Sequence, residues 1–255
     1  MSSLSRVRLP PSIRACLFDL DGVLTNTATV HAAAWKEVFD AYLRERAARF
    51  GEEFRPFDAQ HDYVVFVDGR HRDDGVRSFL ASRRIGLPEG QPDDPPAAET
   101  VAGLGNRKNE RVLAMMHDEG VEAFEGSVRF VTAVRDEGLG TAVVSASANC
   151  AEALAAAGIS ALLDAHVDAI VAEQLRLQGK PAPDTYLAAA RMLGVDASQA
   201  AVFEDAIAGV EAGRAGLFGL VVGVDRAGDA GALRAQGADF VVADLGEILG
   251  RRMAA

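Results

Sequence analysis

Two aspartates separated by one residue, Asp19 and Asp21, follow a short apolar run in the segment CLFDLDGVLTNT. Such a run is typical of a strand buried in a parallel sheet, and open α/β sheets bind ligands beyond the carboxyl ends of their strands. One carboxylate there can attack phosphorus or bind a metal ion while the other transfers a proton. The alternative is an Asp-Gly turn with a capping aspartate, and the motif by itself leaves both interpretations open.

Polar residues follow three more apolar runs. Ser145 in VVSASAN precedes a predicted helix, where its hydroxyl and the next backbone N–H groups could hold a phosphate, although a serine N-cap accounts for it equally well. Lys180 in GKPAPD could neutralise phosphoryl charge, or could be a solvated loop lysine. Glu204 and Asp205 in VFEDAIAGV end a predicted buried strand, where adjacent acids are costly unless they are paired or bind a cation. Their oxygens suit Mg²⁺.

The four motifs together are far more specific than any one of them, because the carboxyl ends of parallel strands meet at one edge of a sheet. Phosphoryl transfer depends mainly on positioning and on stabilising the charge of the equatorial oxygens. One of the two aspartates could supply the attacking oxygen, while Mg²⁺, Lys180 and backbone amides supply positive potential. The sequence therefore predicts a magnesium-dependent site that binds and transfers phosphate.

Alternating strand and helix patterns must position these motifs. Strands are predicted at residues 13–19, 140–145, 167–171, 200–204, 218–223 and 239–242. Helices are predicted between them at 149–157, 183–193 and 206–214. This alternation indicates an α/β fold with a doubly wound parallel sheet.

The interval between the first two strands is too long for a simple connection. About 125 residues separate Asp19 from Ser145, whereas a βαβ unit takes only about 30, and a structureless loop of that length is not expected. Helical patterns occupy 29–49, 73–84 and 106–119, with a short helix at 61–67 and a loop at 88–97. We expect an α-helical cap domain, residues 28–122, inserted into a core domain formed by residues 1–27 and 123–255.

Composition narrows the choice of partners. The 255-residue chain carries a net charge of −11, so neither nucleic acid nor an anionic membrane is an expected partner. Its two cysteines predict no disulfide framework. The N-terminal residues lack the apolar stretch of a signal peptide, and no run approaches the roughly 18 apolar residues of a membrane span. A cytoplasmic protein is predicted, and a monomer is expected because no dimer patch stands out.

The order of the motifs resembles the haloacid dehalogenase superfamily over nearly the whole chain, which implies its Rossmann-like core. The resemblance implies an aspartyl-phosphate formed on Asp19, with Asp21 as the general acid/base. It makes Ser145 and Lys180 phosphate binders.

The same resemblance implies the ligands of the magnesium ion. Asp19 would bind it through its side chain and Asp21 through its backbone carbonyl. Glu204 and Asp205 match the acidic pair of the superfamily, with Asp205 as the direct ligand.

The chain also resembles the β-phosphoglucomutase group of that superfamily. The segment DGVLTNTATVHAAAWK carries Thr27, His31 and Trp35 at positions that match the group. The resemblance implies that the threonine and the histidine set the acid/base aspartate at a hinge. As alternatives, His31 could pack or cap a helix, and Trp35 suits the core better than ligand stacking.

Two segments of the predicted insert resemble substrate-binding motifs of the group. VDGRHRDDGVRSFL points to Arg72 as the residue that grips a distal phosphate, with Arg70 and His71 as competing candidates and a solvated turn as the alternative. NRKNERV points to Lys108 and Asn109, although Lys108 could be an ordinary surface lysine.

The serine-rich segment SASAN adds Ala146, Ser147 and Asn149 as phosphate-site candidates. Two positions depart from the group, since Ala148 stands where lysine is frequent and Ala206 where serine is common. The stretch 44–60 also looks longer than its counterpart in the group.

The implied reaction interconverts β-D-glucose 1-phosphate and glucose 6-phosphate through a glucose 1,6-bisphosphate intermediate, so the expected partner is a small sugar phosphate. The alternative is a phosphatase of the same fold that hydrolyses sugar phosphates or other small esters. A mutase needs a second anion site on the insert and must keep water away from Asp19, because hydrolysis competes with transfer. A non-catalytic scaffold is disfavoured by the intact acidic motifs and Lys180.

Overall fold

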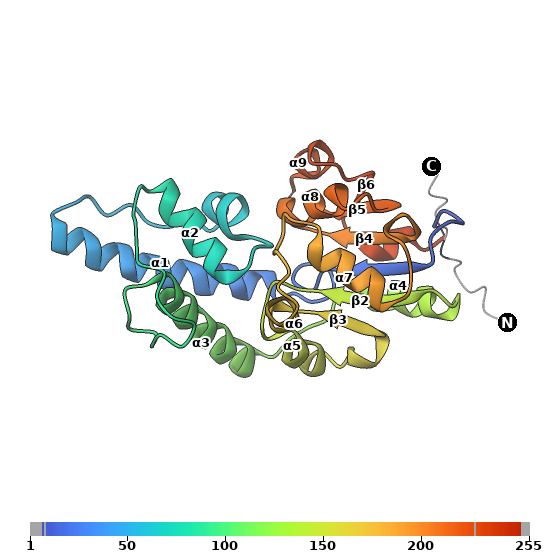
Figure 1. Ribbon diagram of the computed structural model, residues 1–255, viewed down its shortest axis with the longest axis horizontal. Helices are drawn as coiled ribbons and strands as arrows, with labels where there is room; N and C mark the ends of the chain where they lie inside the picture. The colour runs from blue at the N-terminus through green and yellow to red at the C-terminus, as the bar shows by residue number, and fades with distance from the viewer. Residues whose placement is uncertain (1–6, 8, 227, 251–255) are drawn as a thin grey trace. The chain divides into compact units, whose positions relative to one another are not determined.

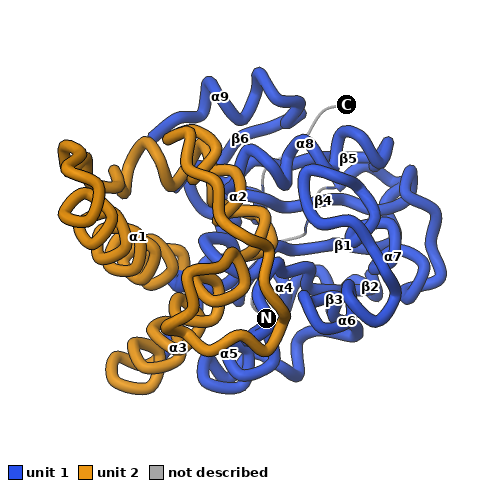
Figure 2. Tube along the Cα trace, turned by 60° about the vertical axis from the view of Figure 1, so that its left-hand side comes forward, with its two compact units in different colours: residues 1–27, 121–255 blue, residues 28–120 orange. Residues whose placement is uncertain are grey.

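The computed structural model describes residues 7, 9–226 and 228–250. The chain forms two compact units (Figure 2). Unit 1 consists of residues 1–27 and 121–255, and unit 2 of residues 28–120. The contact boundaries thus lie at 27/28 and 120/121, compared with 27/28 and 122/123 for the predicted domains.

Unit 1 contains a six-stranded parallel sheet with the strand order β3-β2-β1-β4-β5-β6 (Figure 1). The strands are β1 Ala15–Phe18, β2 Gly140–Val144, β3 Ala165–Val167, β4 Ala200–Glu204, β5 Leu220–Val224 and β6 Phe240–Val242. This order, with β1 at the centre, confirms the predicted doubly wound α/β fold. It also brings the ends of β1, β2 and β4 next to one another.

One predicted strand is wrong. Residues 167–171 were expected to be extended, but β3 ends at Val167 and α6 begins at Ala169. Asp168 caps this helix, because its side chain accepts a hydrogen bond from Val171 N at 2.8 Å. An aspartate N-cap followed by an apolar run fits a helix start as well as a strand.

One face of the sheet is covered by three helices. Leu17 of β1 and Val202 of β4 belong to a buried cluster with Tyr186 of α7, Val210 of α8 and Leu233 of α9. These helices are α7 Asp184–Met192, α8 Ile207–Ala215 and α9 Ala230–Ala235. Alanine-rich helix faces allow close approach to the apolar strands.

The opposite face packs against α4 Glu125–Asp136, a helix that the sequence analysis missed. The rings of Phe18 and Phe203 stack at 4.9 Å, and Phe130 of α4 meets Phe203 edge-on at 5.1 Å. The remaining helices of unit 1 are α5 Cys150–Ala156, α6 Ala169–Gln174, and the short 3-10 turns Ser160–Leu162, Ala197–Gln199 and Leu245–Ile248.

Unit 2 is helical. Its elements are α1 Ala28–Phe50, a π-helical turn Tyr63–Val67, α2 Arg72–Ser82 and α3 Val101–Glu119. Its core is aromatic, with Trp35 stacked on Phe39 at 4.8 Å and Phe39 packed on Phe79 at 4.3 Å. The short helix predicted at 61–67 is confirmed, and α3 begins five residues before the predicted start at residue 106.

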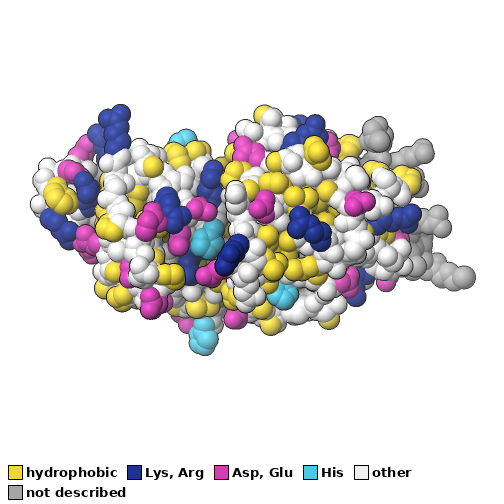
Figure 3. Space-filling view, in the orientation of Figure 1, with side chains coloured by type: hydrophobic (Ala, Val, Ile, Leu, Met, Phe, Trp, Pro, Cys, Tyr) yellow, Lys and Arg dark blue, Asp and Glu magenta, His cyan; other side chains and the backbone are white. Residues whose placement is uncertain are grey.

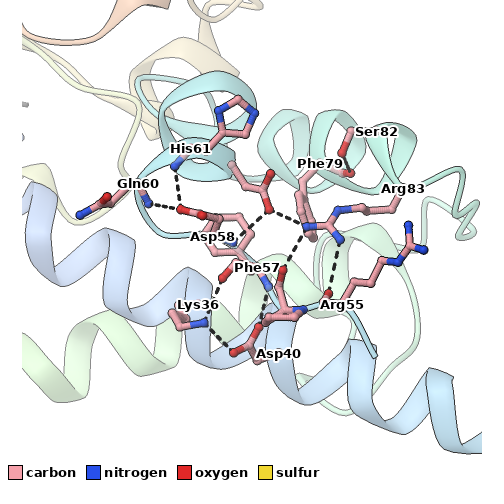
Figure 4. A network of polar contacts seen from close by, with 12 residues as sticks. Lys36, Asp40, Arg55, Phe57, Asp58, Gln60, His61, Phe79, Ser82 and Arg83 are labelled. Carbon is pink, nitrogen blue, oxygen red and sulfur yellow. Dashed lines mark hydrogen bonds and ion pairs between the residues drawn. The ribbon is translucent and has the colours of Figure 1, made fainter. Parts of the chain in front are cut away.

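A network of ion pairs ties a non-helical segment of unit 2 to α1 and α2 (Figure 4). Asp40 accepts hydrogen bonds from Phe57 N at 2.7 Å and from Lys36 Nζ at 2.8 Å. Asp62 accepts one from Arg83 Nη2 at 2.6 Å. Each of these buried carboxylates therefore has a cation beside it.

The described surface of unit 2 is charged, with Lys and Arg interspersed among Asp and Glu over the face shown in Figure 3. None of the described helices combines the length and hydrophobicity that crossing a membrane requires. Cys16 and Cys150 are buried free thiols, as expected from the absence of a disulfide pattern, and burial raises the pKa of both.

Candidate active site

A buried lysine joins two carboxylates at the carboxyl edge of the sheet. Asp19 follows β1 and continues its pairing, because Asp19 N donates to Phe203 O at 2.9 Å. Lys180 donates to Asp19 Oδ1, and also to Glu204 Oε1 at 2.5 Å and to Val144 O at 3.2 Å. The lysine side chain is only 2% exposed. Lys180 is therefore not the solvated loop residue that the sequence left open.

Glu204 is completely buried and held from several directions. Tyr186 Oη donates to Oε1 at 3.0 Å, and Ala206 N donates to Oε2 at 2.9 Å. Both of its oxygens thus accept protein donors. Glu204 therefore fixes Lys180 rather than offering an unengaged oxygen.

The charges of this cluster alter one another. Burial raises the pKa of the Asp19 carboxyl well above its usual range, Lys180 opposes that shift, and the carboxylates of Glu204 and Asp21 add to it. Burial alone would lower the pKa of Lys180, but Asp19 and Glu204 outweigh it and raise that pKa above the usual lysine value. The lysine therefore remains protonated between two acids.

The same cluster has the donors that a divalent cation requires. Asp19, Glu204 and Asp205 can each bring a carboxylate oxygen to within 4.8 Å of the others. With all three acids ionised, the cluster and its one ammonium group would carry a net charge of −2. Oxygen-only ligands with a double negative excess fit Mg²⁺.

Gly22 provides the space for Asp205. A Cβ at Gly22 would lie 1.8 Å from Asp205 Oδ2, and Gly22 has a φ of 87°. Only glycine meets both conditions without strain. The glycine of the DxDG motif thus lets the Asp205 carboxylate lie directly over the backbone of the Asp21–Gly22 turn.

Asp21 has a different setting. Its Oδ1 is hydrogen-bonded to the Thr27 hydroxyl, which also lies 2.7 Å from the Thr25 hydroxyl. If Asp21 is ionised it can only accept, so Thr27 donates to Asp21, and the Thr25 hydroxyl beside it is also within 3.2 Å of Leu20 O. The predicted pairing of Thr27 with Asp21 is thus present in unit 1, and Asp21 is half-buried where Asp19 is buried.

The segment after β2 forms a turn organised by side-chain oxygens. Ser145 is buried, and its Oγ accepts a hydrogen bond from Ser147 N at 3.1 Å. Ser147 Oγ accepts one from Asn149 N at 3.2 Å. The hydroxyl hydrogen of Ser145 and the N–H of Ala146 donate to no acceptor within the described part of the chain.

In unit 2 the structure brings together three predicted residues. Lys108 Nζ lies 2.8 Å from His31 Nδ1 and 5.1 Å from the centre of the Trp35 ring. When Lys108 is protonated its ammonium group can only donate, and His31 Nδ1 is then the acceptor. Lys108 is 7% exposed and is not an ordinary surface lysine, whereas Trp35 belongs to the aromatic core.

The other two predicted residues of unit 2 lie on α2 and α3. Arg72 is the first residue of α2, and its Nε lies 3.7 Å from Asp73 Oδ1 without forming a hydrogen bond. Asn109 follows Lys108 on α3 and is half-buried. No hydrogen bond among the described residues joins Arg72 to Lys108.

Two buried residues of the site were missed by the sequence analysis. Thr25 supports Thr27, and Tyr186 donates to Glu204. Thr25 lies two residues before Thr27, a spacing that could have pointed to it, but nothing local to Tyr186 indicates its partner.

Comparisons with known proteins agree with this geometry. A family model described as a haloacid dehalogenase-like hydrolase matches residues 13–216, a span that includes both carboxylate motifs, Ser145 and Lys180. The chain belongs to the haloacid dehalogenase-like hydrolase family. The resemblance drawn from the four motifs is therefore confirmed, and the protein is an enzyme of this family.

Individual family members match over nearly the whole chain. The β-phosphoglucomutase of Mycobacterium bovis is 56% identical over 244 residues, which cover 94% of this chain and 93% of that protein. The solved β-phosphoglucomutase from Clostridium difficile has a TM-score of 0.71 at 25% identity and covers 92% of each chain. A hydrolase from Pseudomonas syringae has a TM-score of 0.74 at 23% identity, covers 93% of this chain and 97% of that one, and shows the same fold.

Proposed function

We propose that this enzyme is a β-phosphoglucomutase that interconverts β-D-glucose 1-phosphate and glucose 6-phosphate through glucose 1,6-bisphosphate. The observation that most supports phosphoryl transfer at this site is the different setting of two neighbouring carboxylates, because Asp19 contacts an ammonium group and Asp21 a hydroxyl. Different surroundings give such a pair different roles. The 56% identity with the mycobacterial β-phosphoglucomutase supports the same assignment.

Asp19 is the nucleophile in this proposal. A carboxylate oxygen of Asp19 forms a bond to phosphorus while the bond from phosphorus to the sugar oxygen breaks. Lys180 orients the carboxylate and keeps positive charge beside the transferring group. The raised pKa of Asp19 is offset when positive charge binds nearby, since an opposite charge favours the ionised form.

Asp21 is the general acid/base. It gives a proton to the sugar oxygen that leaves phosphorus, and takes a proton from the sugar hydroxyl that attacks in the return step. Thr27 holds its Oδ1, so the side chain keeps one orientation through both steps. Thr25 supports that contact from the protein interior.

Magnesium is the proposed cofactor. Asp19 and Asp205 would hold it with the backbone carbonyl of Asp21, and Glu204, whose two oxygens already accept protein donors, would contribute by fixing Lys180. When bound, Mg²⁺ neutralises charge on the transferring phosphoryl group. The Ser145 hydroxyl and the N–H of Ala146 are the donors proposed for the same phosphoryl group, with Ser147 and Asn149 shaping the turn.

Unit 2 supplies the candidates for the second anion site that a mutase requires. Lys108 is buried beside His31 and Trp35, which orient its ammonium group. Arg72 Nε is buried with no hydrogen-bond partner among the described residues, as expected of a donor that awaits a ligand. Asn109 adds a neutral donor on the same helix as Lys108.

A phosphatase of the same fold is the second candidate. The description of the matching family as hydrolases favours it, and so does the structural similarity to a hydrolase. The core chemistry at Asp19 would be the same, with water in place of the second sugar hydroxyl. The two functions therefore differ in the second anion site and in access of water to the aspartyl-phosphate.

A coupled assay separates them. The enzyme is given β-glucose 1-phosphate, Mg²⁺ and a trace of glucose 1,6-bisphosphate, and both glucose 6-phosphate and free phosphate are measured. Isomerisation that far exceeds phosphate release, and that Asp19→Asn abolishes, is expected. Phosphate release without glucose 6-phosphate would replace the mutase by the phosphatase.

Arg72→Ala tests the second anion site. We expect mutase activity to fall about 10- to 100-fold, the usual effect of losing a hydrogen bond to a charged group, with a smaller effect on phosphate release. Arg77→Ala is the matched control on α2, because Arg77 is half-exposed and paired with Asp74 and Glu89. Equal losses of both activities in Arg72→Ala would argue against a distal site at this residue.

A further inference from the structure

Arg226 lies just after β5 and contacts three separate segments of unit 1. Its Nε donates to Gly22 O at 2.7 Å, and its Nη1 donates to Ala243 O at 2.8 Å. The guanidinium carbon lies 3.7 Å from the centre of the Phe124 ring. One side chain thus links the turn that carries Asp21 to two segments far away in the sequence.

The contact with Gly22 completes the support of the Asp21 turn. Gly22 N donates to Thr25 O at 2.8 Å, and Gly22 O accepts from Arg226. Both peptide groups that flank the Gly22 Cα are therefore held. The Asp205 carboxylate packs directly against Gly22. The position of Gly22 therefore determines where Asp205 can lie in the acidic cluster.

The contact with Phe124 connects Arg226 to the two segments through which the chain leaves unit 1 and returns to it. Phe124 N donates to Leu24 O at 2.9 Å, and Asn26 N donates to Glu122 O at 2.9 Å. These bonds pair the segment that leaves unit 1 with the segment that returns to it. Stacking of the Arg226 guanidinium on Phe124 joins this pair to the end of β5.

Arg226 is not placed where a purely stabilising arginine would be best satisfied. Its Nη2 is buried without a hydrogen-bond partner among the described residues. Its Nη1 also lies 3.6 Å from Asp244 Oδ2. An unsatisfied buried donor costs free energy, so the contacts of Nε and Nη1 must determine where the guanidinium lies.

We infer that Arg226 is a positioning residue for the magnesium site. It holds Gly22, and through Gly22 it fixes the place of Asp205 and of the Asp21 backbone. The inference rests on the proposed function, because that proposal places Mg²⁺ at the acidic cluster. Groups that orient metal ligands usually change metal affinity by roughly 10- to 100-fold when they are replaced.

Magnesium binding measured by titration calorimetry, without substrate, tests this role directly. Arg226→Gln should raise the dissociation constant for Mg²⁺ about tenfold, because the Gly22 carbonyl loses its donor. Arg226→Lys keeps the charge and one donor and should lie between this variant and the natural enzyme. At saturating Mg²⁺, most of the phosphoryl transfer rate should return in both variants.

Arg135→Gln is the matched control. Arg135 donates to Leu162 O at 3.0 Å and pairs with Asp164 at 2.7 Å, also in unit 1. Its replacement removes a similar guanidinium contact from a place that does not touch the Asp21 turn, and should leave the Mg²⁺ dissociation constant unchanged. An unchanged constant in Arg226→Gln, or equal increases in the two variants, would overturn the inference.

Amide hydrogen exchange in the metal-free protein gives a second readout. The amides of Gly22, Leu24 and Thr25 should exchange faster in both Arg226 variants than in the natural enzyme or in Arg135→Gln. If Arg226→Gln does not fold, Arg226→Lys carries both measurements, and its failure to change either one would refute the role.

The calorimetric result distinguishes this inference from the proposed function. A natural enzyme that binds Mg²⁺ but forms neither a phosphoprotein nor glucose 6-phosphate would refute the proposed function alone, and the Arg226 variants would still be compared by their Mg²⁺ affinity. A natural enzyme that binds no Mg²⁺ would refute the positioning role as well.

Discussion

The two units contain buried ion pairs that look alike but differ in charge balance. In unit 2, Asp40 has Lys36 and the Phe57 amide as donors and Arg44 Nη2 at 3.7 Å, so cations balance the charge of this carboxylate. In unit 1, a single ammonium group at Lys180 is shared by Asp19 and Glu204, with the Asp205 carboxylate within reach of the same space.

The difference in charge balance distinguishes an ion pair that stabilises the fold from a cluster that can bind a cation and take part in catalysis. The balanced pair in unit 2 holds a non-helical segment against α1 (Figure 4). The cluster in unit 1 has more negative charge than its own residues neutralise, which is unfavourable in a buried site unless a cation completes it. An unbalanced buried network is therefore a better indicator of a functional site than burial or ion pairing alone.

The largest effect is expected from Lys180→Met. Removal of the ammonium group leaves Asp19 and Glu204 buried together without their cation. Loss of one partner of a buried pair typically costs about 3–5 kcal/mol, and phosphoryl transfer should become undetectable. Urea unfolding and an assay for acid-labile phosphoprotein measure the two effects.

Lys36→Met is the control for that substitution in unit 2. Lys36 is 45% exposed, so its ion pair is screened by solvent and its loss should cost about 1 kcal/mol or less. A larger loss of stability in Lys36→Met than in Lys180→Met would contradict the distinction between the two networks.

Asp19→Asn should abolish catalysis and yet stabilise the metal-free protein by about 1 kcal/mol. Active-site charges that catalysis needs often lower the stability of the folded protein. The asparagine oxygen can still accept from Lys180, and one excess negative charge is removed. Thermal unfolding in the presence of a chelator measures the gain.

The pH dependence of stability gives the same substitution a sharper test. Burial raises the pKa of Asp19 above its value in the unfolded chain, so the folded state holds this proton more tightly. The stability of the metal-free enzyme should therefore fall as pH rises from about 4, the ordinary aspartate range, through the raised pKa. In Asp19→Asn this pH-dependent fall in stability should be absent. Parallel pH profiles of stability for the variant and the natural enzyme would contradict the prediction.

The sequence was sufficient to predict the sheet and the residues at its edge. Buried parallel strands appear as continuous apolar runs, and polar residues placed just after them must meet at one edge. The strand predicted at 167–171 was wrong because Asp168 can begin a helix as readily as it can end a strand. The start of α3 was placed too late because Gly103 and Gly105 weaken the helical signal.

Contacts over long sequence distances could not be predicted. Tyr186 and Glu204 lie 18 residues apart, and Arg226 and Gly22 lie 204 residues apart. Neither pair leaves a local pattern, because only the folded sheet brings the partners together. The pairing of Thr27 with Asp21 spans only six residues, and it was implied by the family resemblance rather than by a local pattern.

Asp40→Asn in unit 2 should have an effect no larger than that of Asp19→Asn and of the opposite sign. The asparagine still accepts from Phe57 N, but the attraction to Lys36 and to the more distant Arg44 is lost. We expect a loss of about 1 kcal/mol, with the Mg²⁺ affinity unchanged. Urea unfolding of both aspartate variants, each in chelator, makes the comparison direct. Because both substitutions replace a buried aspartate by asparagine, a gain at residue 19 and a loss at residue 40 can only reflect the difference in local charge balance, and losses at both positions would remove the basis for it.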